Sequence, residues 1–321
     1  MRPPTTGAGT GSQPSTVLPP RLMAESLGGS GRIAVGTPTG AFTVRAPSKR
    51  HQRRAYRADT VVDAWTAGAV TVRAASVRGD GHRFEGAPRQ DDFALGYHED
   101  SGTVVVAVSD GVSSATDSAV GATAACRYTV GAALDLLDRG QCIQWGELVR
   151  GAAWAVVEAH RQLTQTPPDP SAAERYCACT LIAAAIRPGK DGCAEVSGAG
   201  VGDSALGVLA GDRIDPLTGG KPDDDSGIVA QAVVGLPRVP AELAEVRYTQ
   251  RAGEVLLIGT DGIWDPLGAG TGLLGDLLRA ALGTGPPDQV QFCRIVDFSR
   301  ETFDDDRTLV AVWLAGHSDR T

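Results

Sequence analysis

Short apolar runs bounded by turn residues recur along the chain from about residue 60 onward. Several are apolar at consecutive positions, which is typical of strands buried on both faces. The predicted strands are residues 69–77, 93–97, 103–109, 178–186, 194–200, 205–210, 255–259 and 308–314. Strands of this kind need other layers of structure on both sides.

Apolar residues at helical spacing predict two pairs of helices. The first pair covers residues 116–138 and 145–165, and the second covers residues 272–282 and 288–302. Glycine or proline follows each predicted break, as at Gly140. Because the helices come in pairs and do not alternate with single strands, the order predicts two sheets packed together and covered by helices outside.

Residues 216–241 form a polar excursion rich in proline, glycine and aspartate between predicted strands. Two interpretations stay open for it, a lid over a site and an ordinary surface loop.

The first 57 residues differ from the rest in composition and charge. They are rich in Pro, Gly, Thr and Ser, show no apolar periodicity, and carry nine Lys and Arg residues against the single acid Glu25. Such a segment buries too little apolar surface to offset the entropy of ordering, so we expect residues 1–57 to be a disordered basic tail. A solvated linker is favoured over contact with nucleic acid or an acidic surface, and docking onto the acidic body is a further alternative.

Composition excludes several classes of protein. No stretch approaches the roughly 18–20 apolar residues of a membrane span. The six cysteines are too sparse for a disulfide scaffold or a zinc ribbon, and no secretory signal is recognisable, so we expect a cytoplasmic protein. The 5% aromatic content and the acidic body argue against nucleic-acid binding. The phosphate-loop, nucleophile-elbow and zinc-helix motifs are absent.

Candidate chemistry gathers where apolar strands end at aspartate. The strand at 103–109 runs into Asp110-Gly111, and the strand at 255–259 runs through Thr260 into Asp261-Gly262. An aspartate at the end of a buried strand is held rigidly, and the following glycine lets the backbone turn so that its carbonyl can also face an ion. Either pair alone is typical of an ordinary turn. Because this pattern of a buried strand followed by Asp-Gly occurs twice, it favours a site for Mg²⁺ or Mn²⁺, which prefer oxygen ligands.

Three further acidic clusters occur at predicted strand ends: Asp91-Asp92, Asp203 and the triplet 304–306. Each alone is typical of a turn or a solvated surface. Together with Asp110 and Asp261 they supply enough carboxylate for two divalent ions, which can activate a water for attack on a phosphoryl group.

Taken in order, these segments resemble the motifs of the metal-dependent serine/threonine protein phosphatases of type 2C. The segments that carry the resemblance are residues 90–91, 106–111, 179–181, 200–204, 259–265 and 305–308. A first motif with His82, Gly86 and Gln90-Asp91 is similar to that of the bacterial branch. The resemblance covers about residues 68–315. It implies an α+β fold, a four-layer αββα sandwich of two mainly antiparallel sheets flanked by helix pairs, and makes residues 58–321 the catalytic domain.

The resemblance also implies metal ligands for two core Mn²⁺ or Mg²⁺ ions and a third, weaker one. Asp110 would bridge the core ions, and Gly111 would lend its carbonyl oxygen. Asp261 and Asp305 would complete the shell of the first ion, and Asp203 with Asp261 would bind the third. Asp91 would act near the core site, partly through water. Asp305 is preferred to Asp306 because the family's last motif reads Asp-Asn-x-Ser/Thr, with Thr308 fourth.

This sequence departs from the family at three places. Gly86 occupies the position where many members carry the arginine that binds the substrate phosphate, and Arg83 or Arg89 are the candidate substitutes. Val112 replaces a histidine, which leaves His82 as the nearby candidate for proton transfer, with a plain structural role as its alternative. Gln90 replaces the usual glutamate.

The implied function is hydrolysis of phosphoserine or phosphothreonine in a protein, with Asp110, His82, Arg83 and Arg89 as catalytic candidates. The expected partner is a phosphorylated protein, a candidate target of a serine/threonine kinase, and the expected state is a monomer. Two alternatives stay open: a non-catalytic regulator that binds a phosphoprotein through the same fold, and a hydrolase for a small phosphate ester.

Overall fold

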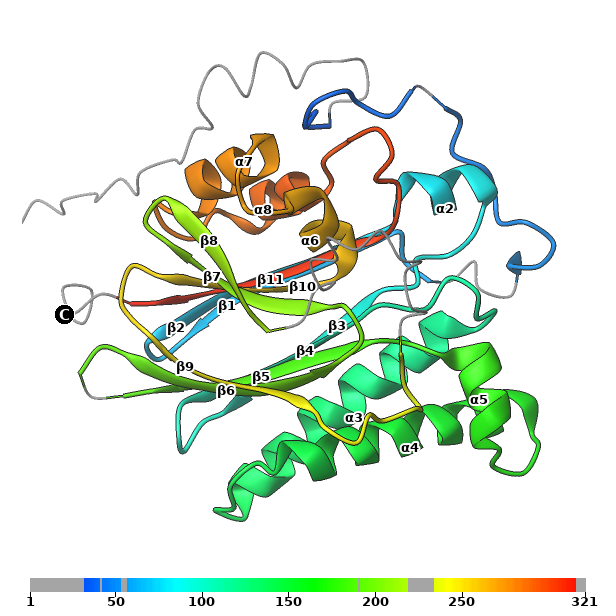
Figure 1. Ribbon diagram of the computed structural model, residues 1–321, viewed down its shortest axis with the longest axis horizontal. Helices are drawn as coiled ribbons and strands as arrows, with labels where there is room; N and C mark the ends of the chain where they lie inside the picture. The colour runs from blue at the N-terminus through cyan, green and yellow to red at the C-terminus, as the bar shows by residue number, and fades with distance from the viewer. Residues whose placement is uncertain (1–31, 41, 53–56, 190, 219–233, 316–321) are drawn as a thin grey trace, which may run out of the picture.

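The computed structural model describes residues 32–40, 42–52, 57–189, 191–218 and 234–315. It confirms the predicted α+β architecture of two antiparallel sheets packed together between layers of helices (Figure 1). All strand pairings between the named strands are antiparallel.

Two sheets form the centre of the molecule. The six-stranded sheet has the order β1 (Thr60–Ala67), β2 (Val70–Val77), β11 (Arg307–Leu314), β10 (Val255–Gly259), β7 (Ala205–Ala210) and β8 (Arg213–Thr218). The five-stranded sheet has the order β3 (Asp92–His98), β4 (Thr103–Ser109), β5 (Leu181–Pro188), β6 (Ala194–Val201) and β9 (Ala244–Gln250).

Helices cover the outer face of each sheet (Figure 1). The five-stranded sheet is covered by α3 (Ser118–Asp138) and α4 (Trp145–Thr164), with α5 (Pro170–Cys177) beside them. The six-stranded sheet is covered by α6 (Asp261–Leu267), α7 (Leu273–Leu282) and α8 (Gln289–Val296). The short helix α2 (Asp80–Glu85) follows β2 at the end of the sheets.

The continuous apolar pattern of β4 follows from its position between two cores. Val104, Val106 and Val108 belong to the core between the sheets, whereas Val105 and Ala107 belong to the core beneath α3 and α4. Successive side chains of a strand point to opposite faces, so a strand with a hydrophobic layer on each side must be apolar throughout.

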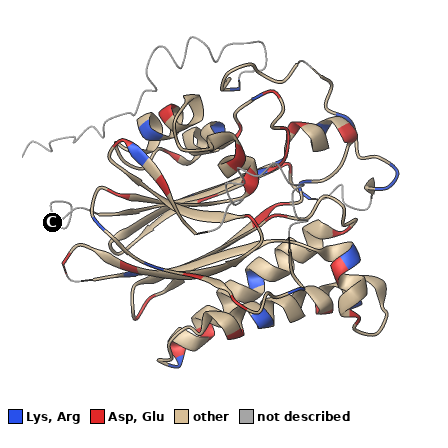
Figure 2. Ribbon diagram, in the orientation of Figure 1, with Lys and Arg blue, Asp and Glu red and all other residues tan. Residues whose placement is uncertain are grey.

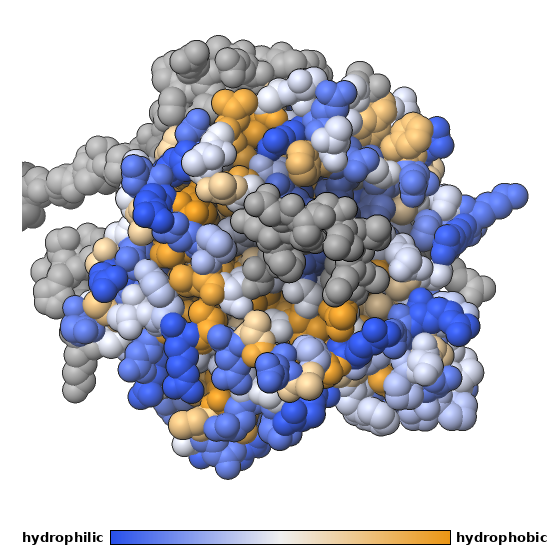
Figure 3. Space-filling view, in the orientation of Figure 1, coloured by the Kyte–Doolittle hydropathy of each residue, from blue (hydrophilic) through white to orange (hydrophobic). Residues whose placement is uncertain are grey.

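The outer surface of α3 and α4 is mostly hydrophilic in the face shown in Figure 3. Within the described ranges, no helix combines the length and the apolar character that crossing a bilayer requires.

Several elements differ from the sequence prediction. The predictions missed the strands β1, β8 and β9 and the helices α2, α5 and α6. β1, β8 and β9 each carry several polar or exposed residues, so they lack the continuous apolar pattern of the central strands. The predicted helix at 288–302 ends at Val296. Of the polar excursion at 216–241, residues 216–218 belong to β8, and residues 219–233 lie outside the described part of the chain.

The N-terminal segment also differs from the expected tail. Residues 32–40 and 42–52, here called the N-terminal arm, lie along the rest of the described fold. Ile33 and Val35 are 3% and 2% exposed and belong to the core beneath α6–α8. The backbone N–H of Val35 donates to the carbonyl of Ser299 at 2.9 Å. Two isolated apolar residues show no periodicity, so the sequence pattern did not predict that Ile33 and Val35 pack in the core. The expectation for residues 1–31 lies outside the described residues.

We expect Ile33→Ala to lower the free energy of unfolding by about 2–4 kcal/mol, because it leaves a cavity in a packed core. Urea unfolding would measure this. The matched control is Val44→Ala, also in the arm but 54% exposed, which we expect to change stability by less than about 0.5 kcal/mol. Equal, small effects of the two substitutions would show that the arm does not contribute to the core.

Candidate metal centre

Asp110 is fixed at the end of β4 by hydrogen bonds to the neighbouring strand-to-loop junction. Its backbone N–H donates to Thr180 Oγ1 at 2.9 Å, and its carbonyl accepts from the backbone N–H of Thr180 at 2.7 Å. The Thr180 hydroxyl in turn lies 2.6 Å from the hydroxyl of Ser204. These contacts join the end of β4 to the β6–β7 turn that carries Asp203.

Three aspartates predicted as ligands converge in space. One carboxylate oxygen each of Asp110, Asp203 and Asp261 lies within 4.8 Å of the other two. Asp203 is in the turn after β6, and Asp261 is the first residue of α6. Figure 2 shows acidic segments gathered at the start of α6 and at the adjoining strand ends. Oxygen donors at this spacing can surround one divalent cation.

Asp91 is completely buried beside this group. Its Oδ2 accepts hydrogen bonds from the hydroxyls of Thr260 and Thr308, each at 2.8 Å. Its Oδ1 has no hydrogen-bond partner in the described part of the structure. A buried carboxylate oxygen without a donor is costly, and a cation or a cation's water shell would satisfy it.

Burial and neighbouring negative charges raise the pKa values of Asp91 and Asp110. Burial, together with the charges of Asp306 and Asp305, raises the pKa of Asp91 to about 7. Burial, together with the charges of Asp91, Asp261 and Asp305, raises the pKa of Asp110 well above its usual range. Closely spaced anions of this kind favour either protonation or a bound cation. The donor set therefore fits the Mn²⁺ or Mg²⁺ that the sequence predicted.

The glycines after Asp110 and Asp261 serve packing and not a turn. Neither Gly111 nor Gly262 has a positive φ. A Cβ on Gly262 would lie 1.9 Å from the carbonyl oxygen of Asp306, and a Cβ on Gly111 would lie 2.7 Å from Ser118 Oγ. Close packing and not a left-handed φ is therefore what these positions require of glycine, and the metal contact of the Gly111 carbonyl stays a prediction.

Asp305 and Asp306 have different surroundings. Asp306 is buried, and its Oδ1 accepts from the backbone N–H of Gly79 at 2.6 Å while its Oδ2 accepts from that of Gln90 at 2.5 Å. Asp305 is partly exposed and faces the cleft described below. Because both oxygens of Asp306 are engaged by backbone donors, the geometry favours Asp305 as the ligand.

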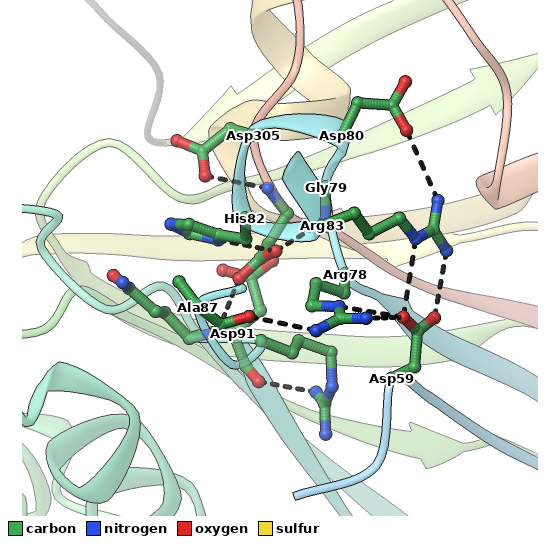
Figure 4. Close-up of polar contacts among 12 residues, drawn as sticks. Asp59, Arg78, Gly79, Asp80, His82, Arg83, Ala87, Asp91 and Asp305 are labelled. Atoms are coloured by element: carbon green, nitrogen blue, oxygen red, sulfur yellow. Dashed lines mark hydrogen bonds and ion pairs between the residues drawn. The ribbon is translucent and has the colours of Figure 1, made fainter. Parts of the chain in front are cut away.

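His82 is held against Asp306, with Nδ1 2.9 Å from Asp306 Oδ1 (Figure 4). Burial alone would lower the pKa of His82, but the charge and hydrogen bond of Asp306, with smaller contributions from Asp305 and Asp91, raise it to about 9. The imidazole is therefore positively charged at neutral pH, and it can donate a proton but cannot act as a free base there.

Arg83 and Arg89 do not join the metal centre. The guanidinium of Arg83 lies 3.0 Å from Asp59 (Figure 4). It also lies 3.0 Å from Asp297. Arg89 is 2% exposed and donates to the Ser76 hydroxyl and to the carbonyl of Asp91. Arg83 is thus engaged by carboxylates and Arg89 by a hydroxyl and backbone carbonyls, so the sequence-based suggestion that they bind substrate phosphate finds no support in their positions.

Gly86 is required by the N-terminal arm. Its φ is +69°, and a Cβ there would lie 2.3 Å from the carbonyl oxygen of Ala46. The arm thus occupies the space that an arginine at residue 86 would need.

A cleft of about 390 Å³ lies beside the aspartates described above, here called the acidic cluster. Its lining includes Arg50, His51, His82, Gln90, Thr116 and Asp305. Sequence reasoning missed Arg50, His51 and Thr116 as site residues. The only signal for the first two was the basic run at 49–54, which was interpreted as part of a tail.

We expect Mn²⁺ to raise the melting temperature more at pH 7.5 than at pH 5.5. The raised pKa of Asp91 means that the metal-free folded state binds a proton more tightly than the unfolded chain does. Its stability therefore falls as pH rises from about 4 to about 7, while the ionised carboxylates bind metal better.

Asp91→Asn should reduce the difference between the Mn²⁺-induced shifts at the two pH values, because the amide carries no charge. It should also raise the melting temperature of the EDTA-treated protein at pH 7.5 by about 3 °C or more, the shift that about 1 kcal/mol gives at this size. The control is Asp212→Asn, at an exposed residue of the β7–β8 turn. An identical Mn²⁺ shift at both pH values in the wild type would contradict the proposed role of the carboxylates.

We expect Arg83→Met to lower the free energy of unfolding by about 2–3 kcal/mol, because it removes the cation shared by Asp59 and Asp297 and leaves each of these partly buried carboxylates with a single arginine partner. The control is Arg213→Met, whose pair with Asp215 is exposed and should contribute less than about 1 kcal/mol. In a double-mutant cycle measured by urea unfolding, Arg83→Met and Asp297→Asn should show a coupling of at least about 1 kcal/mol. Additive effects would mean that the ion pair is energetically unimportant.

Comparison with known proteins bears on the fold and on the family. Three solved serine/threonine phosphatases share the fold. The catalytic domain of PstP in complex with two manganese ions has a TM-score of 0.52 at 17% identity, over 77% of this chain and 99% of that chain. The S. agalactiae enzyme has a TM-score of 0.51 at 14% identity, over 79% and 99%. The Mycobacterium tuberculosis PstP/Ppp structure has a TM-score of 0.50 at 15% identity, over 78% and 100%.

At these identities the structural likeness establishes the fold alone. A search of curated protein sequences found no match. The sequence model of the family described as Protein phosphatase 2C matches residues 78–284, which is more than half of the chain. On this match, the chain belongs to the protein phosphatase 2C family.

Proposed function

We propose that this chain is a metal-dependent phosphatase that removes phosphate from phosphoserine and phosphothreonine in proteins. The observation that carries the proposal is the convergence of Asp110, Asp203 and Asp261, with Asp91 and Asp305 near enough for their charges to act on Asp110, in a fold of the protein phosphatase 2C family. When bound, divalent Mn²⁺ or Mg²⁺ would supply an activated water and neutralise charge on the phosphoryl group.

The protein residues would hold and orient the reacting groups. Asp110 would bridge two core ions, with Asp261 and Asp305 completing the set and Gly111 lending its carbonyl. Asp91 is oriented by the hydroxyls of Thr260 and Thr308, which fix the direction of its open Oδ1. Asp203 and Asp261 would hold a third, weaker ion.

His82 is the candidate general acid. The carboxylate of Asp306 keeps its imidazole protonated at neutral pH and fixed at the wall of the cleft. A protonated imidazole can give its proton to the departing serine or threonine oxygen. Val112, at the family's other histidine position, has no proton to give.

The alternative of a non-catalytic regulator loses its main support. Gly86 favoured that alternative in the sequence, but packing against Ala46 of the arm accounts for the glycine. The candidate ligand aspartates are all retained. A phosphorylated protein, itself a target of a serine/threonine kinase, stays the proposed partner, and a cytoplasmic monomer stays the proposed state.

We expect the wild type to release phosphate from a phosphothreonine peptide and from p-nitrophenyl phosphate with Mn²⁺, and to lose this activity in EDTA. Asp110→Asn should lower kcat/KM by about 100-fold or more, because several kcal/mol of charge stabilisation would be lost. The control is Asp212→Asn, which should leave the rate unchanged. Mn²⁺ binding by calorimetry without turnover of either substrate would establish the regulator instead.

A further inference from the structure

The cleft beside the acidic cluster contains one arginine. Among the described residues, Arg50 is the single Arg or Lys in its lining, and it comes from the N-terminal arm. Its Nη2 donates to Thr116 Oγ1 at 2.9 Å, and both residues line the same cleft as Asp305 and His82 of α2.

The other arginines near the centre are engaged elsewhere. Arg83 is paired with Asp59 and Asp297, and Arg89 is buried against Ser76. Arg57 donates to the carbonyls of Arg89 and Asp91. Arg50, by contrast, is exposed, and the Thr116 contact uses only one of the five N–H groups of a guanidinium. It therefore keeps donors that can face a ligand in the cleft.

The arm positions Arg50 through backbone contacts with α2 and its end. The backbone N–H of Arg45 donates to the carbonyl of Arg83 at 3.0 Å, and that of Ser48 donates to the carbonyl of Gly86 at 3.1 Å. A turn follows, in which the backbone N–H of His51 donates to the carbonyl of Ser48 at 2.8 Å. Arg50 lies within that turn, so main-chain hydrogen bonds fix the position of its backbone beside α2.

The arm also packs on α2 through side chains. The ring of Phe42 meets the ring of Phe84 edge to face at 6.4 Å, and the guanidinium of Arg45 lies 4.1 Å from the centre of the Phe84 ring. Aromatic and cation–π contacts of this kind add to the backbone bonds in holding the arm at the cleft.

The cleft carries negative as well as positive charge, and Arg50 is the one cation among its described lining residues that stays charged at every working pH. Glu85, Asp304 and Asp305 line it and would repel a phosphate dianion. A guanidinium fork matches two phosphate oxygens at once, which gives both charge and direction. We propose that Arg50, carried by the N-terminal arm, binds the phosphate group of the substrate, an inference that rests on the phosphatase function proposed above.

The test compares Arg50→Gln with Lys49→Gln in the full chain loaded with Mn²⁺. Lys49 is the neighbouring cation of the arm but is exposed and does not line the cleft. Arg50→Gln should lower kcat/KM for a phosphothreonine peptide about 10-fold and raise the Kd of inorganic phosphate about 10-fold, the loss expected for one charge-assisted contact. Arg50→Lys should give kcat/KM and Kd values between those of the wild type and Arg50→Gln, because lysine keeps the positive charge but lacks the two-pronged guanidinium. Lys49→Gln should change either value less than about twofold.

Two measurements separate this inference from the proposed function. Calorimetry with inorganic phosphate reports binding even if no substrate is hydrolysed, so phosphate binding that depends on Arg50 without turnover would sustain the inference and refute the phosphatase. Turnover in the wild type with unchanged KM and phosphate Kd in Arg50→Gln would refute the inference and keep the phosphatase. Wild-type protein that binds no phosphate would overturn the role of Arg50 as well.

Discussion

The carboxyl groups of Asp91, which is fully buried, and Asp110, which is partly buried, lie beside each other at strand ends; loss of hydration raises both pKa values, and the charge of Asp91 raises that of Asp110 further. The surrounding structure resists their separation. The hydroxyls of Thr260 and Thr308 fix Asp91, and Thr180 fixes the backbone of Asp110. Each of these threonines sits at the end of a strand or next to one, so the electrostatic cost of the site is offset by the packing of both sheets. Stability given up at a binding site in this way is recovered when the ligand binds.

Around this centre, the arginines mainly form ion pairs that connect separate elements of the fold. Arg83 connects α2 to Asp59 before β1 and to Asp297 after α8. Arg32 of the arm adds pairs with Asp80 and Asp297 at 2.6 and 2.9 Å. The result is a continuous set of ion pairs that fixes α2, and with it His82, relative to the six-stranded sheet. A single arginine of the arm is left to face the cleft within the described structure.

The sequence predicted the central strands and the outer helices because both depend on local patterns. β4 and β10 are apolar at nearly every position, and aspartate follows each of them, so the acidic convergence was also predictable. Edge strands such as β1 were missed because one of their faces is exposed and their pattern is mixed. The role of Arg83 was missed because its partner Asp297 is 214 residues away in the chain, and no local pattern encodes a contact of that range. The packing of Ile33 and Val35 was hidden for the same reason, since the core that receives them is built from distant segments.

The contact between Gly86 and Ala46 links two parts of the chain that evolution would otherwise be free to change separately. A larger residue at 86 displaces the arm, and displacement of the arm removes Arg50 from the cleft. Conversely, a chain that loses the arm loses the steric bar to a side chain at 86, and only the left-handed φ of +69° still favours glycine there. The order in which such substitutions can accumulate is therefore constrained, because the arm must be lost before a larger residue can be accommodated at 86.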